Sequence, residues 1–191
     1  MASKWPDSQV RREIHEFNLE FLELICADGS PGAAYGLDQA VRQRLLLLAP
    51  AQREAVAATP CLLAAFTVLP PRVIAQGVAE APLMAIRESQ SEAARLFAAS
   101  LLAWLWHTAR QDRLLAALCI GPGSLAVEHL RSAAFRDLQR TAAEAFGCLE
   151  ARFCRHPRLW PDLVRAASLP AGPVLTATRL SVVQLTLISR H

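Results

Sequence analysis

The sequence predicts an all-α protein that contains two diverged copies of one helical unit. Along most of the chain, apolar residues recur at intervals of three and four, the spacing that places side chains on one face of a helix. A stretch at residues 51–66 also recurs with substitutions at residues 138–153, so that Gln52 and Gln139 are 87 positions apart. A repeat of this kind indicates duplicated helical units that pack their apolar faces against each other.

The evidence for the repeat is a set of identical residues that have the same spacing along the sequence in both copies. The two copies share a Gln-Arg pair, a Cys-Leu pair, a phenylalanine and several alanines. The shared positions are Gln52/Gln139, Arg53/Arg140, Ala55/Ala142, Ala58/Ala145, Cys61/Cys148, Leu62/Leu149, Ala64/Ala151 and Phe66/Phe153. The alanine matches carry little weight in an Ala-rich chain, so the other matches support the hypothesis. The alternative at this point is chance similarity between two Ala-rich amphipathic helices.

The composition is that of a folded protein in a reducing compartment. Of the 191 residues, 53% are hydrophobic and 19% are charged, which excludes a disordered chain. The longest apolar stretch, residues 97–107, is too short to cross a bilayer, and there is no signal-peptide pattern, so we expect a cytoplasmic protein without membrane contact. The five scattered cysteines favour free thiols over disulfides. The formal net charge of +3 does not by itself indicate nucleic-acid binding.

The first half of the chain contains the start signals of three helices. Residues 5–7, Trp-Pro-Asp, open the first helix, which a Gly-Ser-Pro-Gly stretch stops. Asp38 is expected to cap the second helix, and Pro50 is expected to begin the third. The third helix should run to about Phe66, with a kink or a break at Pro60.

The second half repeats this order after a longer helix. Residues 82–111 form the longest predicted helix, in which Trp104 and Trp106 cannot both lie on the centre of the apolar face. We expect one of them to contact a partner element or another chain. The helices predicted after it cover residues 114–120 and 124–132, a second core helix that ends near Cys154, and residues 159–167. Residues 174–188 fit a helix or a strand, and their periodicity does not decide between the two.

Residues in both halves resemble the family of the flagellar transcriptional regulator FlhD. In the first half, the matching positions are Glu16-Phe17-Asn18-Leu19, Phe21-Leu22, Gly36-Leu37, Leu45, Leu48, Gln52, Ala57, Thr59, Leu62-Leu63 and Phe66. In the second half, they are Arg110-Gln111-Asp112, Gly121, Gln139, Leu149 and Phe153. FlhD-family proteins are all-α homodimers that join a zinc-containing protein, FlhC, to activate flagellar promoters.

The resemblance implies two tandem FlhD-like units that pack as an intramolecular pseudo-dimer. The first unit would cover residues 1–78 and the second residues 79–169, followed by a tail at residues 170–191. Ala64 and Ala151 stand where the family has a cysteine, which rules out a dimer-linking disulfide there. Asp28 and Asp112 match an acidic residue of the family's partner surface, so these two residues and Trp106 are the predicted partner-binding residues.

The sequence contains no motif for catalysis, cofactor binding or metal binding. The histidines within the predicted helices have no recognisable nucleophile motif beside them, and the Gly-Pro-Gly stretch at residues 121–123 lacks the Lys-Ser/Thr of a phosphate loop. Cys148, Cys154 and His156 fit no standard zinc spacing, so we expect core thiols instead of a metal site. The chain is therefore predicted not to be an enzyme, and no catalytic residue, cofactor or metal ligand is assigned.

A run of arginines on and after the second core helix is the candidate nucleic-acid contact. Its members are Arg136, Arg140, Arg152, Arg155 and Arg158. The spacings 136/140 and 152/155 would place each pair on one helix face, where guanidinium groups can contact phosphates. The alternative is an ordinary solvated helix surface, because Asp137, Glu144 and Glu150 are interleaved with the arginines.

These observations together predict a regulatory protein that acts through protein–protein contacts. By its resemblance to FlhD, it would be a transcriptional co-regulator of flagellar or related genes. Its expected partner is another protein, such as an FlhC-like subunit, through which DNA would be contacted, and homo-oligomers are compatible with this interpretation. The alternative is a helical chaperone, scaffold or adaptor without DNA contact, for example one that serves a secretion apparatus.

Overall fold

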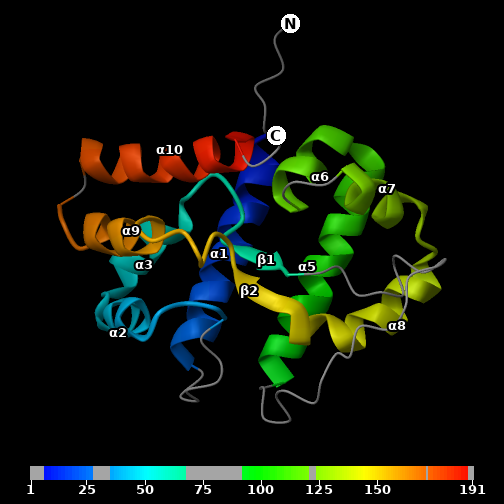
Figure 1. Ribbon diagram of the computed structural model, residues 1–191, viewed down its shortest axis with the longest axis horizontal. Coiled ribbons are helices and arrows are strands. Elements are labelled where there is room, and N and C mark those ends of the chain that lie inside the picture. Colours follow the sequence, from blue (N-terminus) through cyan, green and yellow to red (C-terminus); the bar gives the residue numbers. More distant parts are fainter. Residues whose placement is uncertain (1–6, 28–34, 68–91, 121–123, 171, 189–191) are drawn as a thin grey trace, which may run out of the picture. The chain divides into compact units, whose positions relative to one another are not determined.

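The computed structural model describes residues 7–27, 35–67, 92–120, 124–170 and 172–188, and these residues are mostly helical (Figure 1). The all-α class predicted from the sequence is therefore confirmed. The helices are α1 (Ser8–Ala27), α2 (Gln39–Leu47), α3 (Pro50–Ala57), α5 (Glu92–Gln111), α6 (Arg113–Ile120), α7 (Ser124–Ser132), α8 (Phe135–Ala145), the 3-10 turn η2 (Phe146–Cys148), α9 (Leu159–Ala167) and α10 (Pro173–Ile188). In this part of the chain, two short strands, β1 (Ala64–Phe66) and β2 (Leu149–Ala151), pair in a two-stranded sheet.

The chain divides into two compact units. Unit 1 contains Met1–Ala64 and Ala151–Ser189, and unit 2 contains Ala65–Glu150 with Arg190–His191. The chain passes from one unit to the other inside β1 and returns inside β2. The domain ranges expected from the sequence repeat, and the pseudo-dimer they imply, stay predictions.

Unit 1 is built from α1, α2, α3, α9 and α10. Helix α1 packs on α2 and α3, and α9 packs on α2, α3 and α10. The side chains at the centre of this unit are fully buried, and each contributes roughly 1.5–3 kcal/mol by leaving water. They include Phe21, Leu22, Ile25, Leu45, Val56, Leu163 and Trp160. The ring of Tyr35 meets the ring of Phe21 edge-on, with the centroids 5.4 Å apart.

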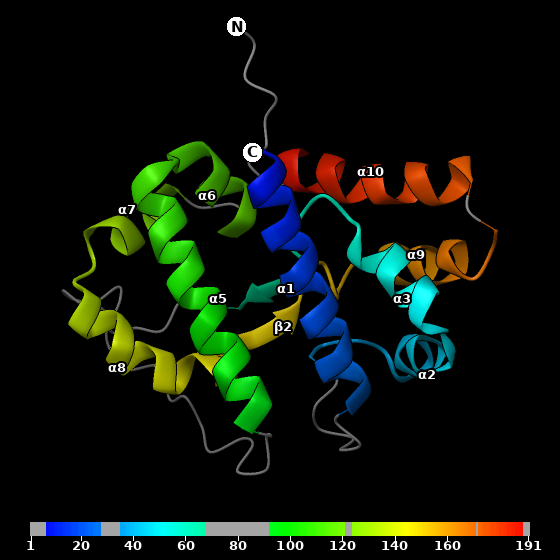
Figure 2. The same ribbon diagram turned by 180° about the vertical axis from the view of Figure 1, so that it is seen from behind.

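Unit 2 is organised around α5. This helix packs on α6, α7, α8 and η2, and α6 also packs on α7 (Figure 2). Its buried face combines large residues with alanines, which allow the neighbouring helices to approach closely. The buried residues of α5 are Ala94, Phe97, Ala98, Leu101, Leu102, Leu105, Thr108 and Ala109. Phe97, Leu101, Leu105 and Thr108 of the predicted apolar face are packed, whereas Ala93 and Leu96, also predicted for that face, are exposed. Residues 82–91 of the predicted helix lie outside the described residues.

Several predicted helix starts are confirmed. The carboxylate of Asp38 accepts a hydrogen bond from the backbone N–H of Ala40 at 2.7 Å, which caps α2. Helix α3 begins at Pro50, where the side chain of Gln52 accepts a hydrogen bond from the N–H of Ala49 at 2.9 Å. Helix α7 begins at Ser124 and α9 covers the predicted residues 159–167. The open question about residues 174–188 is settled in favour of a helix, α10.

The predicted ends of the two core helices are wrong. The first ends at Ala57 instead of near Phe66, and residues 64–66 form β1. The second ends at Ala145 instead of near Cys154, and β2 follows η2. Helix α3 ends close to Pro60, which has no backbone N–H to donate along a helix.

The same order of elements occurs in both halves of the chain. A helix of 20 residues, α1 or α5, is followed by one of 9 residues, α2 or α7. Then come the core helix, α3 or α8, and a strand, β1 or β2. Helix α6 has no counterpart in the first half among the described residues, because residues 28–34 lie outside them. This order agrees with a duplication, which stays a prediction.

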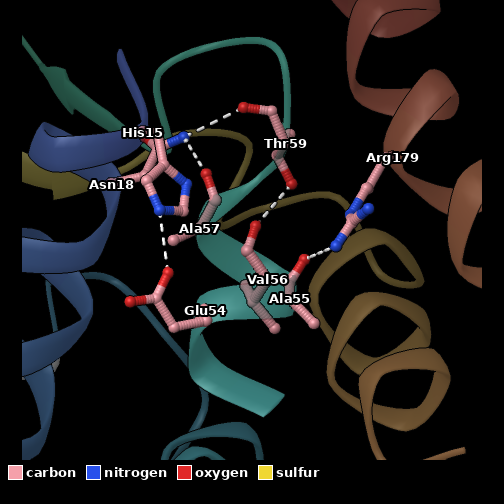
Figure 3. A network of polar contacts seen from close by, with 8 residues as sticks. All are labelled: His15, Asn18, Glu54, Ala55, Val56, Ala57, Thr59 and Arg179. Carbon is pink, nitrogen blue, oxygen red and sulfur yellow. Dashed lines mark hydrogen bonds and ion pairs between the residues drawn. The ribbon is translucent and has the colours of Figure 1, made fainter. Parts of the chain in front are cut away.

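A buried asparagine fixes the chain after α3. The Nδ2 atom of Asn18 on α1 donates to the carbonyls of Ala57, Thr59 and Cys61 at 3.1, 3.1 and 3.0 Å. Its Oδ1 atom accepts from the N–H of Leu63 at 2.7 Å. Figure 3 shows this amide together with the Thr59 hydroxyl, which donates to the carbonyl of Val56 at 2.7 Å. One side chain therefore satisfies backbone groups that the end of the helix leaves unpaired.

The substitution Asn18→Ala should lower the free energy of unfolding by roughly 3 kcal/mol or more, because each buried backbone group left without a partner costs about 1–3 kcal/mol. Urea denaturation followed by circular dichroism measures the change. The matched control is Gln9→Ala on the same helix. The exposed Gln9 side chain donates a hydrogen bond to Glu13, and its loss should change stability by no more than about 0.5 kcal/mol. A loss below about 1 kcal/mol for Asn18→Ala would contradict the organising role of this amide.

Candidate protein-binding surface

Trp106 lies on the flank of α5, between the buried face and the solvent. Its neighbours Leu105, Thr108 and Ala109 are buried, whereas Trp106 itself is half-buried. The indole Nε1–H donates to the carbonyl of Ala133 at 3.0 Å. Ala133 belongs to the short link between α7 and α8, so this bond fastens the link to α5. The residue that the sequence singled out for an outside contact therefore holds an element of unit 2.

The exposed edge of the indole belongs to a small aromatic and cationic cluster. The ring of Phe135, at the start of α8, lies 5.8 Å from the Trp106 ring between centroids. The guanidinium carbon of Arg110 lies 4.8 Å from the centre of the Trp106 ring, within cation–π range. Phe135 is nevertheless 55% exposed. We call Trp106, Arg110 and Phe135 the Trp106 cluster.

Two predicted nucleic-acid contacts lie near this cluster on α8. Arg136 follows Phe135 directly, and Arg140 is one helical turn further along. Both are exposed, as is Arg110, and none of the three forms an ion pair with a carboxylate in the described part of the chain. The pair 136/140 shares one helix face as expected. Three exposed arginines therefore lie on α5 and α8, the two helices that carry the Trp106 cluster, with the half-buried Asp137 beside Arg136.

The other three arginines of the predicted run lie in unit 1. Residues 152–158 are turns, so the prediction that Arg152 and Arg155 share a helix face is wrong. Arg152 is only 5% exposed, and its guanidinium lies 5.3 Å from the centre of the Phe153 ring. Arg155 is exposed, and Arg158 lies 3.7 Å from the carboxylate of Asp162.

The backbone of Arg152 has a structural role. Its N–H donates to the carbonyl of Leu63 at 2.7 Å, and its carbonyl accepts from the indole N–H of the buried Trp160 at 2.8 Å. These two bonds tie the turn after β2 to the segment before β1 and to α9. Nothing in the sequence indicated this role, because the predicted core helix ran through Arg152 to Cys154.

Of the two acidic residues predicted to bind a partner, Asp28 and Asp112, the structure describes only Asp112. Asp28 lies outside the described residues. Asp112 lies between α5 and α6, and its Oδ1 atom accepts hydrogen bonds from the N–H groups of Leu114 and Leu115 at 2.9 and 3.0 Å. Asp112 is thus the cap of α6, a local role that its position before a helix indicates.

The structure gives the surroundings of several described titratable groups. No three His, Cys, Asp or Glu side chains among them are grouped to hold a metal ion. His15 pairs with Glu54, with Nε2 and Oε2 2.8 Å apart (Figure 3), and the Nδ1 atom of His156 accepts from the N–H of Leu159 at 3.1 Å. None of the five cysteines, all of which lie in the described ranges, forms a disulfide. Burial raises the pKa of Cys26 and of Cys61, which disfavours the reactive thiolate.

Comparisons with protein-family models, with curated proteins and with solved structures find no match to this chain. The resemblance to FlhD therefore depends on the residues quoted from the sequence. Among the described helices, none is both long enough and apolar enough to span a membrane. We therefore take the Trp106 cluster, with its exposed Phe135, as the candidate protein-binding site.

The substitution Trp106→Phe should lower the free energy of unfolding by about 1 kcal/mol, because it removes the hydrogen bond to Ala133 and keeps most of the apolar area. Urea denaturation measures this change. Leu96→Ala is the control, since Leu96 is exposed on the same helix and should change stability by less than about 0.5 kcal/mol. Equal stabilities of Trp106→Phe and the unmodified chain would show that the indole N–H does not hold the α7–α8 link.

Proposed function

We propose that this chain is a non-enzymatic regulatory protein that binds another protein through the Trp106 cluster and acts as a transcriptional co-regulator of the FlhD kind. The observation that carries the proposal is the exposed Phe135 beside an indole that is already fixed by hydrogen bonding. Trp and Arg are the residues that most often dominate the energy of protein–protein contacts. The FlhD-like residues in both halves of the sequence supply the transcriptional context.

The cluster is preorganised for binding. The bond from Trp106 to Ala133 and the stacking of Arg110 hold the indole in one orientation, so little side-chain entropy is lost when a partner arrives. A partner that covers Phe135 removes apolar surface from water at roughly 25 cal/mol per Å². Arg110, Arg136 and Arg140 add positive charge at the rim, which favours a partner surface that carries carboxylates.

The distribution of arginines supports an indirect route to DNA. Arg136 and Arg140 are exposed in unit 2, whereas Arg152 is buried and Arg158 faces Asp162 in unit 1. Non-specific affinity for DNA grows with the number of phosphates that are neutralised together, and two adjacent arginines neutralise few. We therefore assign most of the DNA contact to the partner, as an FlhC-like subunit would provide.

The same distribution favours a second candidate function. A helical chaperone, scaffold or adaptor also binds proteins through an exposed aromatic cluster, and it needs no phosphate-binding surface at all. The burial of Arg152 removes one of the five predicted DNA contacts and is the observation that favours this candidate. The two functions differ in whether the complex with the partner binds promoter DNA.

The double substitution Arg110→Ala, Phe135→Ala should weaken partner binding at least tenfold, a loss of about 1.4 kcal/mol. Affinity purification from the native cells identifies the partner, and titration calorimetry with the purified partner measures the loss. The control Leu96→Ala, an exposed apolar residue of the same unit, should bind like the unmodified chain. Unchanged affinity of the double variant would refute the assignment of the partner to the Trp106 cluster.

A mobility-shift titration with promoter DNA separates the two candidate functions. The co-regulator should shift DNA only together with its partner, and the shift should weaken as salt is raised. A complex that fails to shift any promoter fragment supports the chaperone or scaffold. Tight binding by the chain alone, abolished by the double substitution Arg136→Ala, Arg140→Ala, would show direct DNA contact and contradict the indirect route.

A further inference from the structure

The corner at which α2 and α3 meet exposes a run of apolar residues (Figures 1 and 2). Residues 46–51 read Leu-Leu-Leu-Ala-Pro-Ala, and only Leu48 among them is buried. Leu47 is 84% exposed, more than any other exposed large hydrophobic residue of the described chain, and Leu46 is 46% exposed. The buried residues of α2 are Val41 and Leu45, and the helix packs on α1 and α9, so the two exposed leucines belong to its outer side.

Arginines stand on both flanks of the exposed leucines. Successive residues of a helix are about 100° apart around its axis, so Arg42 and Arg44 lie on opposite sides of the strip that contains Leu46 and Leu47. Arg44 is exposed and Arg42 is half-buried. An apolar strip between basic flanks is the pattern of a helix that lies on a membrane surface, with its apolar side chains at the boundary of the acyl chains.

Two of the arginines are held beside the corner by hydrogen bonds to the backbone. The Nε atom of Arg42 donates to the carbonyl of Ile25 on α1 at 3.3 Å. The Nε atom of Arg53 on α3 donates to the carbonyl of Leu48 at 3.2 Å. A guanidinium carries five N–H groups, so this one bond positions Arg53 without using up its capacity to bind phosphate oxygens.

The corner carries positive charge without acidic residues of its own. Residues 39–53 contain three arginines and neither aspartate nor glutamate. Within the described ranges, neither Arg44 nor Arg53 forms an ion pair. The acidic residues that bracket the stretch have partners elsewhere, since Asp38 caps α2 and Glu54 pairs with a histidine of α1. A partner with a dense negative charge therefore complements this corner.

The shape of the corner favours a lipid surface over a folded protein. Leu46 and Leu47 leave the helix in directions about 100° apart, so a protein partner would need a separate complementary pocket for each. The fluid boundary between headgroups and acyl chains accepts protruding side chains of any shape, and arginines can extend from it to the phosphates. An anionic bilayer thus matches both the apolar run and the charge around it.

We propose that the corner formed by residues 42–53 binds the surface of an anionic membrane. The two exposed leucines enter the boundary between headgroups and acyl chains, while Arg42, Arg44 and Arg53 contact lipid phosphates. The expectation of no membrane contact was based on the lack of a spanning segment and of a signal peptide, neither of which a surface contact needs. The corner belongs to unit 1, so this inference is independent of the Trp106 cluster of unit 2, on which the proposed function depends.

The small size of the corner sets the expected strength. Two leucines remove less apolar surface from water than a myristoyl chain, and one such chain gives only marginal, reversible binding. Each arginine close to an anionic surface strengthens binding about fivefold. The contact should therefore be weak and reversible, and it should need the leucines and the arginines together.

Co-sedimentation of the full chain with lipid vesicles tests the apolar contribution. The chain should bind vesicles of phosphatidylcholine and phosphatidylglycerol in equal parts, and far less to vesicles of phosphatidylcholine alone. Leu47→Gln should weaken binding about tenfold, because it removes apolar surface and leaves the charge unchanged. The matched control Leu180→Gln changes an exposed leucine of α10 in the same unit and should bind like the unmodified chain. Circular dichroism should show equal helix content in all three proteins.

The same vesicles test the contribution of charge. Arg44→Gln should weaken binding about fivefold, and added salt should weaken binding of the unmodified chain. The control Arg140→Gln removes the same charge from an exposed position in unit 2 and should bind like the unmodified chain. Failure to bind anionic vesicles, equal binding to neutral vesicles, or binding that survives Leu47→Gln or Arg44→Gln unchanged would overturn the proposal. A soluble protein that binds through Leu47, while vesicles do not bind, would overturn it as well.

Discussion

The buried amide of Asn18 is the interaction on which the arrangement of unit 1 depends. Helix α3 ends at Ala57, and the chain that follows has to turn while several of its carbonyls are buried. The side chain of Asn18 on α1 hydrogen-bonds to three of those carbonyls and to one N–H group. Few residues other than asparagine carry both the donor and the acceptor that this requires. The chain then reaches Leu63 in a defined position, and β1 begins at the next residue.

The strand pair follows from this turn. Leu63, held by Asn18 through its N–H, accepts a hydrogen bond from Arg152 through its carbonyl. In unit 2, the N–H of Thr67 donates to the carbonyl of Cys148 at 2.8 Å. The backbone between these bonds is β1 and β2, where the chain changes units. The amide of Asn18 on α1 is thus connected through Leu63 to the backbone of Arg152, just after the chain returns to unit 1.

Each unit exposes apolar side chains on part of its surface. In unit 2, the hydrogen-bonded indole of Trp106, the guanidinium of Arg110 and the exposed ring of Phe135 form the proposed protein-binding cluster. In unit 1, the corner between α2 and α3 exposes an apolar run with arginines on its flanks.

The sequence by itself determined the helical class and most helix starts, because starts depend on local chemistry. Asp38 and Pro50 act within their own first turn, and Asp112 could have been recognised as a cap by the same rule. Tertiary structure alone decided where the core helices end, that Arg152 is buried, and that residues 174–188 form a helix. Those outcomes depend on Asn18, Trp160 and α9, partners far away in the sequence, whose contacts no periodicity encodes.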